Sequence, residues 1–364
     1  MKILFLTTHL NMGGITRYLL TLAKGLRRLG HEVHLASGGG DMIPQFEALG
    51  AKHLLLSIRT KSELDPKIYL ALRPLAKYIE KENIEIVHAQ TRITQVMGSL
   101  LHKFKRVPYV STCHGYFKPR LSRRWWPCWG ECIAISPAVA EHLHKDFHLP
   151  KEKIHLVTHG IDLEDFSPIS LEEKVRLRKQ YMLKDEPVIG MIARLSPIKG
   201  QDILIRAMPQ ILEQVPNAKL LLFGEGKTRN ELIALVQQLN LRKRIEFYPI
   251  IDQTAQSLSV MNVVVVPSRQ EGLGLSVMEA QACAVAVVAS RVGGIPSLIE
   301  DGKTGVLVEA ENVAMLADRV VTLLKDDARR NSMGLSAREY ALKHYSSQRM
   351  VDRTLEVYRN AINR

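Results

Sequence analysis

Short apolar segments alternate with amphipathic, helix-prone segments from one end of the chain to the other. Parallel strands need crossover connections, usually helices, so this alternation predicts parallel sheets that are covered by helices. The chain is therefore expected to be an α/β protein. The predicted strands lie near residues 2–8, 32–37, 52–57, 84–89, 108–113, 131–135 and 154–157 in the first half, and near 187–192, 219–223, 244–247, 262–266, 285–289 and 305–308 in the second.

The length of 364 residues is enough for two domains with separate hydrophobic cores. A polar, helix-prone segment at residues 171–181 separates the two sets of strands. We predict two Rossmann-like, doubly wound domains, one over residues 1–168 and one over residues 183–345. The last segment, residues 346–364, has apolar residues spaced among charges and is expected to be an amphipathic helix.

The chain is basic, with a formal net charge of +13. Residues 1–165 carry 23 Lys and Arg against 15 Asp and Glu, and the remainder carries 27 against 22. Nucleic acid, anionic lipid and anionic glycan all attract a basic protein. No nucleic-acid-binding motif is visible, so we favour an anionic membrane surface or a phosphorylated acceptor as the partner.

No segment reaches the roughly 18 apolar residues that a membrane-spanning helix requires. We therefore expect a cytoplasmic protein, peripheral on the inner face of the cytoplasmic membrane. Residues 118–129 gather four cations and all three Trp of the chain, a composition that suits a membrane interface or an acceptor pocket. Packing of the Trp side chains against the sheet explains them equally well. The candidate contact residues are Arg120, Arg123, Arg124, Trp125 and Trp126.

Two acidic residues eight positions apart, Glu271 and Glu279, follow an apolar run that we predict to be a buried strand. Gly272 and Gly274 keep the loop tight, and a helix is expected to begin near Leu275. The first carboxylate then projects from the loop, and the second lies about one turn inside the helix. Between them lie the free N–H groups of the helix N-terminus, an arrangement that suits phosphates flanked by hydroxyl groups, as in a nucleotide sugar.

Two basic residues, Arg194 and Lys199, stand in the same half of the chain. Arg194 follows the carboxyl end of the strand predicted at residues 187–192, and Lys199 precedes the next helix. Ligands of open parallel sheets bind at the carboxyl ends of strands. Two cations at that edge can neutralise a diphosphate leaving group without a metal ion, and the sequence contains no clean Asp-x-Asp metal motif.

With these motifs in this order, the chain resembles the retaining glycosyltransferases of family 4, which have the two-domain GT-B architecture. The matching features cover nearly the whole chain. They are Gly13-Gly14, His114 in Ser-Thr-Cys-His-Gly, Arg194 with Lys199, Glu271-x7-Glu279, Gly293 to Pro296, and Asp301-Gly302-x-Thr304-Gly305. The resemblance implies two domains that face each other across a cleft, with the last helix crossing back to the first, acceptor-binding domain.

The resemblance also implies a role for each matching residue. His114 would hydrogen-bond the donor sugar near its reacting carbon, Glu271 would hold a hydroxyl of the transferred sugar, and Glu279 would hold the ribose hydroxyls. The residues expected to bind the diphosphate are Gly13, Gly14, Arg194, Lys199, Gly274, Leu275 and Ser276. Glycine at positions 13 and 14 would also suit an ordinary turn from strand to helix.

The implied reaction transfers a hexose from a nucleoside diphosphate sugar, with UDP favoured, to a hydroxyl of a lipid-linked or cell-envelope glycan, as in lipopolysaccharide or polysaccharide biosynthesis. The configuration at the anomeric carbon would be retained, and no metal or cofactor would be needed. Two alternatives share the fold: a sugar-nucleotide epimerase or phosphorylase, and a non-catalytic nucleotide-sugar-binding subunit. One departure from the family pattern is His159, which stands where an Asn is common.

Overall fold

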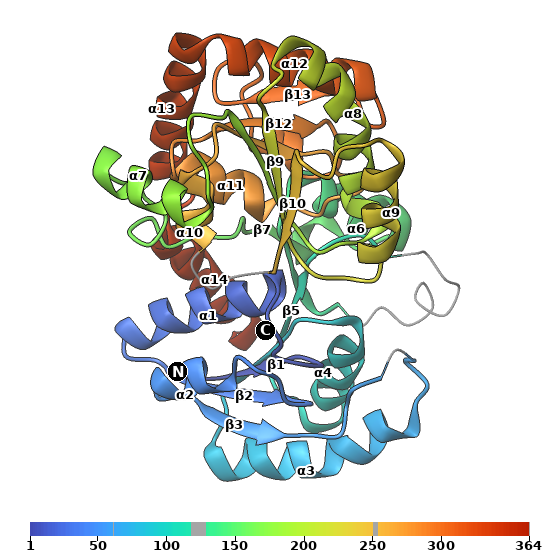
Figure 1. Cartoon of the computed structure of the whole chain (residues 1–364). Coiled ribbons are helices and arrows are strands. Elements are labelled where there is room, and N and C mark those ends of the chain that lie inside the picture. Colours follow the sequence, from blue (N-terminus) through green and yellow to red (C-terminus); the bar gives the residue numbers. More distant parts are fainter. Residues whose placement is uncertain (61, 118–128, 250–253, 364) are drawn as a thin grey trace. The chain divides into compact units, whose positions relative to one another are not determined.

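The computed structural model describes residues 1–60, 62–117, 129–249 and 254–363. The chain forms two compact units (Figure 1). Unit 1 comprises Met1–Ile161 together with Ser347–Arg364, and unit 2 comprises Asp162–Ser346. The helix-prone segment that we placed between the domains is helix α7 (Leu171–Gln180), and it belongs to unit 2.

Unit 1 is built on a parallel sheet with the strand order β3-β2-β1-β4-β5-β6-β7. Its strands are β1 (Lys2–Leu6), β2 (Glu32–Ser37), β3 (Lys52–Leu55), β4 (Ile86–Ala89), β5 (Tyr109–Cys113), β6 (Glu131–Ala134) and β7 (Ile154–Leu156). Its helices are α1 (Gly14–Arg28), α2 (Ile43–Ala48), α3 (Pro66–Glu82), α4 (Arg92–Lys105), α6 (Pro137–Phe147) and α14 (Ser347–Ile362).

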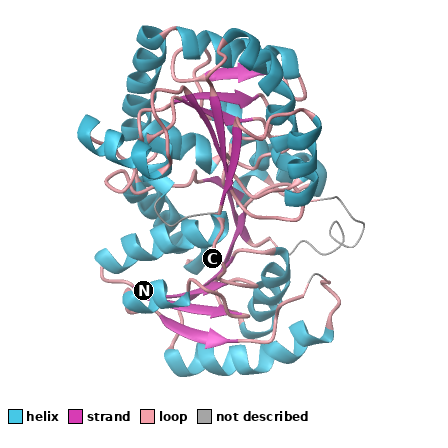
Figure 2. Ribbon diagram, in the orientation of Figure 1, coloured by secondary structure: helices cyan, strands magenta, loops and turns pink. Residues whose placement is uncertain are grey.

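Strand β1 shows why this sheet is covered on both faces. Ile3 and Phe5 point into a core that contains residues of α1 and α14, whereas Leu4 and Leu6 point into a second core with α3 and α4. Successive side chains of a strand face opposite sides of its sheet, so a strand of continuous apolar residues needs helices on both sides. Figure 2 shows these helices flanking the strands.

Helix α14 brings the last residues of the chain onto unit 1. Its buried face includes Met350, Val351, Leu355 and Tyr358. The helix lies close against α1, because a Cβ added at Gly25 would come within 2.4 Å of a Val351 methyl carbon. The Tyr358 hydroxyl is 2.7 Å from Nδ1 of the buried His88 in β4, so the helix is joined to the sheet by a polar contact as well.

Unit 2 contains a second parallel sheet, with the order β10-β9-β8-β11-β12-β13. Its strands are β8 (Val188–Ile192), β9 (Lys219–Phe223), β10 (Ile245–Tyr248), β11 (Val263–Val266), β12 (Ala286–Ser290) and β13 (Val306–Val308). Besides α7, its helices are α8 (Gln201–Gln214), α9 (Arg229–Gln238), α10 (Thr254–Ser259), α11 (Leu275–Ala282), α12 (Val313–Lys325) and α13 (Asp327–His344).

The predicted α/β class and both parallel sheets are confirmed. Every predicted strand is present, with ends that differ by no more than two residues. Strand β11 is buried on both faces, as β1 is. Val263 and Val265 join a core with residues of α8, α9 and α12, and Val264 and Val266 are buried on the opposite face. Among the described residues, none of the helices is long and apolar enough to cross a bilayer.

Candidate active site

The strand order of unit 2 fixes where a ligand can bind. Strands β8 and β11 are neighbours in the sheet, but the chain runs from β8 outward to β9 and β10 before it returns to β11. This is the topological switch point of a doubly wound sheet, where a crevice forms beyond the carboxyl ends of the strands. The loop after β8 carries Arg194 and Lys199, and the loop after β11 carries Glu271.

Lys199 and Glu271, 72 positions apart in the chain, meet at this edge. The Lys199 ammonium is 2.5 Å from Glu271 Oε2, and the Ser268 hydroxyl donates to the same oxygen at 3.2 Å. The two charged side chains are largely buried, at 22% and 14% exposure. An ammonium has three N–H donors, so Lys199 can bind Glu271 and still donate to an anion.

Glycine at position 200 allows these two loops to meet. Its φ is +75°, and an added Cβ would lie 2.0 Å from the Pro267 carbonyl oxygen, which is an impossible contact. The backbone before α8 therefore touches the backbone after β11 at a place where only glycine fits. The sequence places Gly200 directly after Lys199, but the partner across the crevice is visible only in the fold.

Arg269 clamps the same two loops together, and the sequence analysis missed it. Its guanidinium binds both carboxylate oxygens of Asp202 at 2.8 Å and donates to the Pro197 carbonyl oxygen at 2.6 Å. It also pairs with Glu311, in the loop before α12. These partners lie 42 to 72 positions away, so no local pattern could have indicated the clamp.

The N-terminus of α11 completes this side of the crevice. Gly274, with φ +110°, caps the helix, so Leu275 and Ser276 are its first residues, as the sequence predicts. The first N–H groups of a helix have no partner within the helix, and they carry the positive end of its dipole. The Glu271 carbonyl oxygen accepts a 3.2 Å hydrogen bond from the Gly294 amide, so the Gly-Gly-x-Pro segment fixes the backbone of the loop between β11 and α11.

Glu279 lies in α11, and its environment differs from that of Glu271 in the preceding loop. It is 5% exposed, so it is not a solvated charge at a helix end. Its charge helps to raise the pKa of Cys283, whose pKa is brought to about 12 chiefly by burial. A carboxylate kept this far from water must be held by hydrogen-bond donors or positive dipoles.

Arg194 is exposed, and its guanidinium makes no hydrogen bond or ion pair within the described ranges. Its backbone is nevertheless fixed, since Gln201 Nε2 donates to the Arg194 carbonyl oxygen at 2.9 Å. A Gly-x-Gly turn after β9 packs beside it, where a Cβ at Gly226 would lie 2.0 Å from the Leu195 carbonyl oxygen. Two glycines after an apolar strand, Gly224 and Gly226, are the sequence signal for this turn.

In unit 1 the matching switch point lies between β1 and β4, and Gly13-Gly14 follow β1 there. Gly13 caps α1 with extended backbone, at φ 165°. A Cβ added to it would meet only the Asn11 carbonyl oxygen, at 3.9 Å. Neither conformation nor packing within the protein requires glycine at position 13, and this favours a ligand contact over an ordinary turn.

His114, just after β5, is held as a neutral ring. Its Nε2 lies 2.9 Å from Gln90 Oε1, and its ring packs against Tyr18 and His159 at centroid distances of 5.1 and 5.3 Å. Burial, followed by the neighbouring His159 and His88, lowers the pKa of His114 well below its ordinary value. The Nε2 proton then donates to Gln90, which leaves Nδ1 as an acceptor.

The proposed membrane or acceptor segment cannot be placed in the same way. Arg120, Arg123, Arg124, Trp125 and Trp126 lie outside the described residues. Trp129, at the end of the same segment, is fully buried, with the Arg92 guanidinium 5.3 Å from its ring centre. For this one Trp, packing in the core accounts for the residue.

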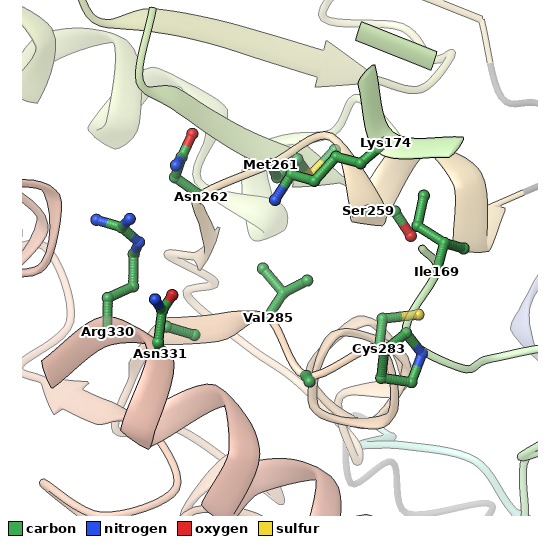
Figure 3. Close-up of a pocket in the computed structure, with 12 residues that line it drawn as sticks. Ile169, Lys174, Ser259, Met261, Asn262, Cys283, Val285, Arg330 and Asn331 are labelled. Carbon is green, nitrogen blue, oxygen red and sulfur yellow. The ribbon is translucent and has the colours of Figure 1, made fainter. Parts of the chain in front are cut away.

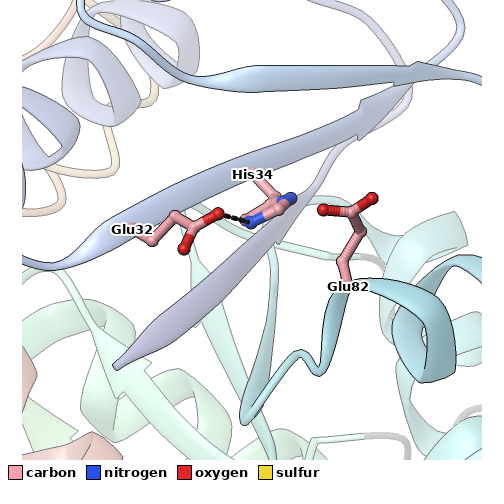
Figure 4. A group of neighbouring side chains, drawn as sticks. All are labelled: Glu32, His34 and Glu82. Carbon is pink, nitrogen blue, oxygen red and sulfur yellow. Dashed lines mark hydrogen bonds and ion pairs between the residues drawn. The ribbon is translucent and has the colours of Figure 1, made fainter.

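One group of side chains in unit 1 has the composition of a metal site. Glu32, His34 and Glu82 each offer a ligand atom within 4.8 Å of the others (Figure 4). Lys52, however, lies 2.7 Å from Glu82 Oε2 and 3.4 Å from Glu32 Oε1, and its ammonium balances both carboxylates. The group is an ion-pair network between strands and α3, and it supports no metal proposal.

Comparison with known families matches both halves of the chain. Residues 12–165 match the family described as Glycosyltransferase Family 4, and residues 173–340 match the family described as Glycosyl transferases group 1. An uncharacterised glycosyltransferase of Methanocaldococcus jannaschii is 29% identical over 376 residues, which cover 96% of this chain and 95% of the relative.

Two further similar proteins are described with a sugar nucleotide. The GDP-mannose-dependent α-(1-6)-phosphatidylinositol monomannoside mannosyltransferase of Mycolicibacterium smegmatis is 34% identical over 205 residues, covering 54% of this chain and 53% of the relative. The crystal structure of Anabaena HepE in complex with UDP-glucose superposes with a TM-score of 0.87 at 22% identity and covers 99% of each chain.

Proposed function

We propose a specific reaction for this chain, which belongs to glycosyltransferase family 4 and has the GT-B fold. The chain transfers a hexose from a nucleoside diphosphate sugar to a hydroxyl group of a lipid-linked or cell-envelope glycan. The anomeric configuration is retained, and no metal ion takes part. The observation that carries the proposal is the Lys199–Glu271 pair at the switch point of unit 2, beside Arg194 and the N-terminus of α11.

The diphosphate is assigned to the positive groups of this crevice. Arg194 and Lys199 neutralise the charge that develops on the leaving group, and the first N–H groups of α11 add donors that need no reorganisation. Removing one such preorganised donor typically costs about 100- to 1000-fold in rate. In unit 1, the bare backbone at Gly13-Gly14 is assigned to a phosphate contact.

The hydroxyl groups of the donor are assigned to the carboxylates. Glu271 uses Oε2 for Lys199 and Ser268, and Oε1 makes no hydrogen bond within the described residues, so it can accept from a sugar hydroxyl. Glu279 holds the ribose. His114 hydrogen-bonds the transferred sugar near its reacting carbon. Retention follows if the acceptor oxygen attacks on the leaving-group face and a donor phosphate oxygen takes its proton.

The first test is ligand binding by thermal shift, with UDP, GDP, ADP and their glucose or mannose derivatives, for the wild type and for Lys199→Ala. We favour UDP. A shift with one nucleotide series that disappears in the variant supports the diphosphate assignment, whereas equal shifts in both proteins contradict it.

The second test is product analysis with and without a glycan acceptor, in excess chelator. Transfer in chelator supports the metal-free reaction, and strict dependence on added metal opposes it. Conversion of the donor sugar to its epimer when no acceptor is present would replace the transferase by an epimerase.

A further inference from the structure

A cavity of about 180 Å³ lies in unit 2, at the end of the sheet opposite to the candidate active site (Figure 3). Asn262, which lines it, immediately precedes β11, whereas Glu271 follows that strand. Five residues of extended chain separate Asn262 from Pro267, about 17 Å. The cavity is therefore a separate place on the same sheet.

Lys174, from α7, gives the cavity its positive charge. It is half-buried, and its ammonium has no hydrogen bond or ion pair with any described residue. Burial, and then the nearby Arg178 and Arg330, lower the pKa of Lys174. A buried charge without a partner is costly, and an anion in the cavity would remove that cost.

Three more polar groups face the same space. Arg330 in α13 uses its Nη atoms for the Leu323 carbonyl oxygen and for Asp327, so it keeps its position without a ligand. Asn262 accepts from the Val188 amide through Oδ1 at 2.8 Å, which leaves its NH₂ group to donate. Figure 3 shows Lys174, Arg330, Asn331 and Asn262 around one opening, and they come from three different segments.

The rest of the wall includes the apolar side chains of Ile169, Met261 and Val285, together with Ser259 and Cys283. A water molecule occupies about 30 Å³ of liquid, so the cavity holds the volume of about six waters. That is room for one tetrahedral oxyanion with a small organic group. The cationic side chains and the apolar part of the wall suit a ligand that carries both an anionic group and a carbon skeleton.

We propose that this cavity is a second anion site, which binds a small phosphomonoester with its phosphate against Lys174, Arg330 and the amide groups of Asn262 and Asn331. A dianionic phosphate has enough acceptor oxygens for all four donors. The site is distinct from the diphosphate site of the proposed transfer reaction, and it stands whether or not that reaction is correct.

The test measures phosphate binding in a background in which Arg194 and Lys199 are both replaced by alanine, so that neither cation of the candidate active site contributes. Inorganic phosphate is titrated first by calorimetry, and glucose 6-phosphate and a short-chain phosphatidic acid follow. Lys174→Met and the isosteric Asn331→Asp should each weaken binding about tenfold or more, because each removes a charged contact or adds a like charge. Lys179→Met, an exposed lysine of the same helix, should leave binding unchanged.

Asn331→Asp should fold even if Lys174→Met does not, since it alters the charge at an exposed position without a change of shape. Tighter binding of glucose 6-phosphate than of phosphatidic acid identifies a soluble metabolite as the source, and the reverse order identifies a lipid headgroup. Equal phosphate affinity in the background, in Lys174→Met and in Asn331→Asp overturns the proposal. A loss in Lys179→Met as large as that in Lys174→Met also overturns it.

Discussion

Replacing Lys199 by alanine should separate the catalytic use of this cation from its structural use. The exposures of 22% for Lys199 and 14% for Glu271 place the pair between a surface ion pair and a buried one. Surface pairs contribute about 0–1 kcal/mol, and breaking a buried pair costs about 3–5 kcal/mol. We therefore expect Lys199→Ala to lower the unfolding free energy by about 1–3 kcal/mol, because Glu271 keeps its charge and loses its main partner.

The catalytic loss should be larger. Loss of one cation from a preorganised leaving-group site corresponds to about 3–4 kcal/mol in transition-state stabilisation, or at least about 100-fold in kcat/KM. The double variant Lys199→Ala with Glu271→Gln removes the orphaned carboxylate as well. It should recover most of the lost stability, as measured by urea unfolding, and none of the lost activity, as measured by initial rates of sugar transfer.

Lys303→Ala is the control for this experiment. Lys303 pairs with Glu300 at 2.8 Å, but the two side chains are 70% and 47% exposed. Its loss should leave both the unfolding free energy and the transfer rate nearly unchanged. The reasoning is refuted if Lys199→Ala transfers sugar at a near-normal rate, or if activity returns in the double variant together with stability.

Three other results are expected. Gly200→Ala should destabilise unit 2 by about 2 kcal/mol or more, since its Cβ cannot coexist with the Pro267 carbonyl. Gly302 has φ +79° but no described atom within 4 Å of an added Cβ, so Gly302→Ala should cost only about 1 kcal/mol. Thermal melts of the two variants measure the difference. Arg269→Lys should lose the bidentate contact with Asp202 and weaken donor binding by calorimetry, while Arg319→Lys, an exposed arginine with a 3.7 Å contact to Asp318, should not. Burial lowers the pKa of both His88 and His159 to about 3. The unfolded chain therefore binds protons that the folded chain cannot, and stability present above about pH 6.5 should fall by about 2 kcal/mol per histidine between pH 7 and pH 5. In urea titrations His159→Asn should remove the share of one histidine, about 2 kcal/mol, from that loss. An unchanged pH profile in His159→Asn would contradict the assignment.

The sequence predicted the parts of this molecule that depend on local pattern. Runs of four or five apolar residues, such as β11, specify buried strands, and the order of strands and helices specifies parallel sheets. The rule that ligands bind at strand carboxyl ends singled out Arg194 and Lys199 after β8 and Glu271 after β11. The structure brings Lys199 and Glu271 together at that edge.

What the sequence could not show are contacts between distant segments. Arg269 reads as one more charge after a strand, yet it binds Asp202 and Glu311, which no periodicity connects to it. Lys174 reads as one of several charges on a polar helix, but tertiary packing half-buries it beside α13 and the start of β11. The opposite fates of Lys174 and Lys179, five positions apart on α7, depend only on which face of the helix meets the rest of unit 2.

The ion pair between Lys199 and Glu271 determines how much positive charge the crevice keeps for a ligand. Lys199 neutralises Glu271 at 2.5 Å, and the pair as a whole contributes little net charge to the crevice. In the proposed reaction, the attraction for the diphosphate then rests on Arg194, whose guanidinium has no partner in the described part of the chain, and on the positive end of α11. In the proposed reaction, Lys199 is therefore a positioned hydrogen-bond donor, whereas Arg194 provides the long-range field. Added salt should weaken donor binding through Arg194 more than through Lys199, because exposed charges are screened and partly buried pairs are screened much less.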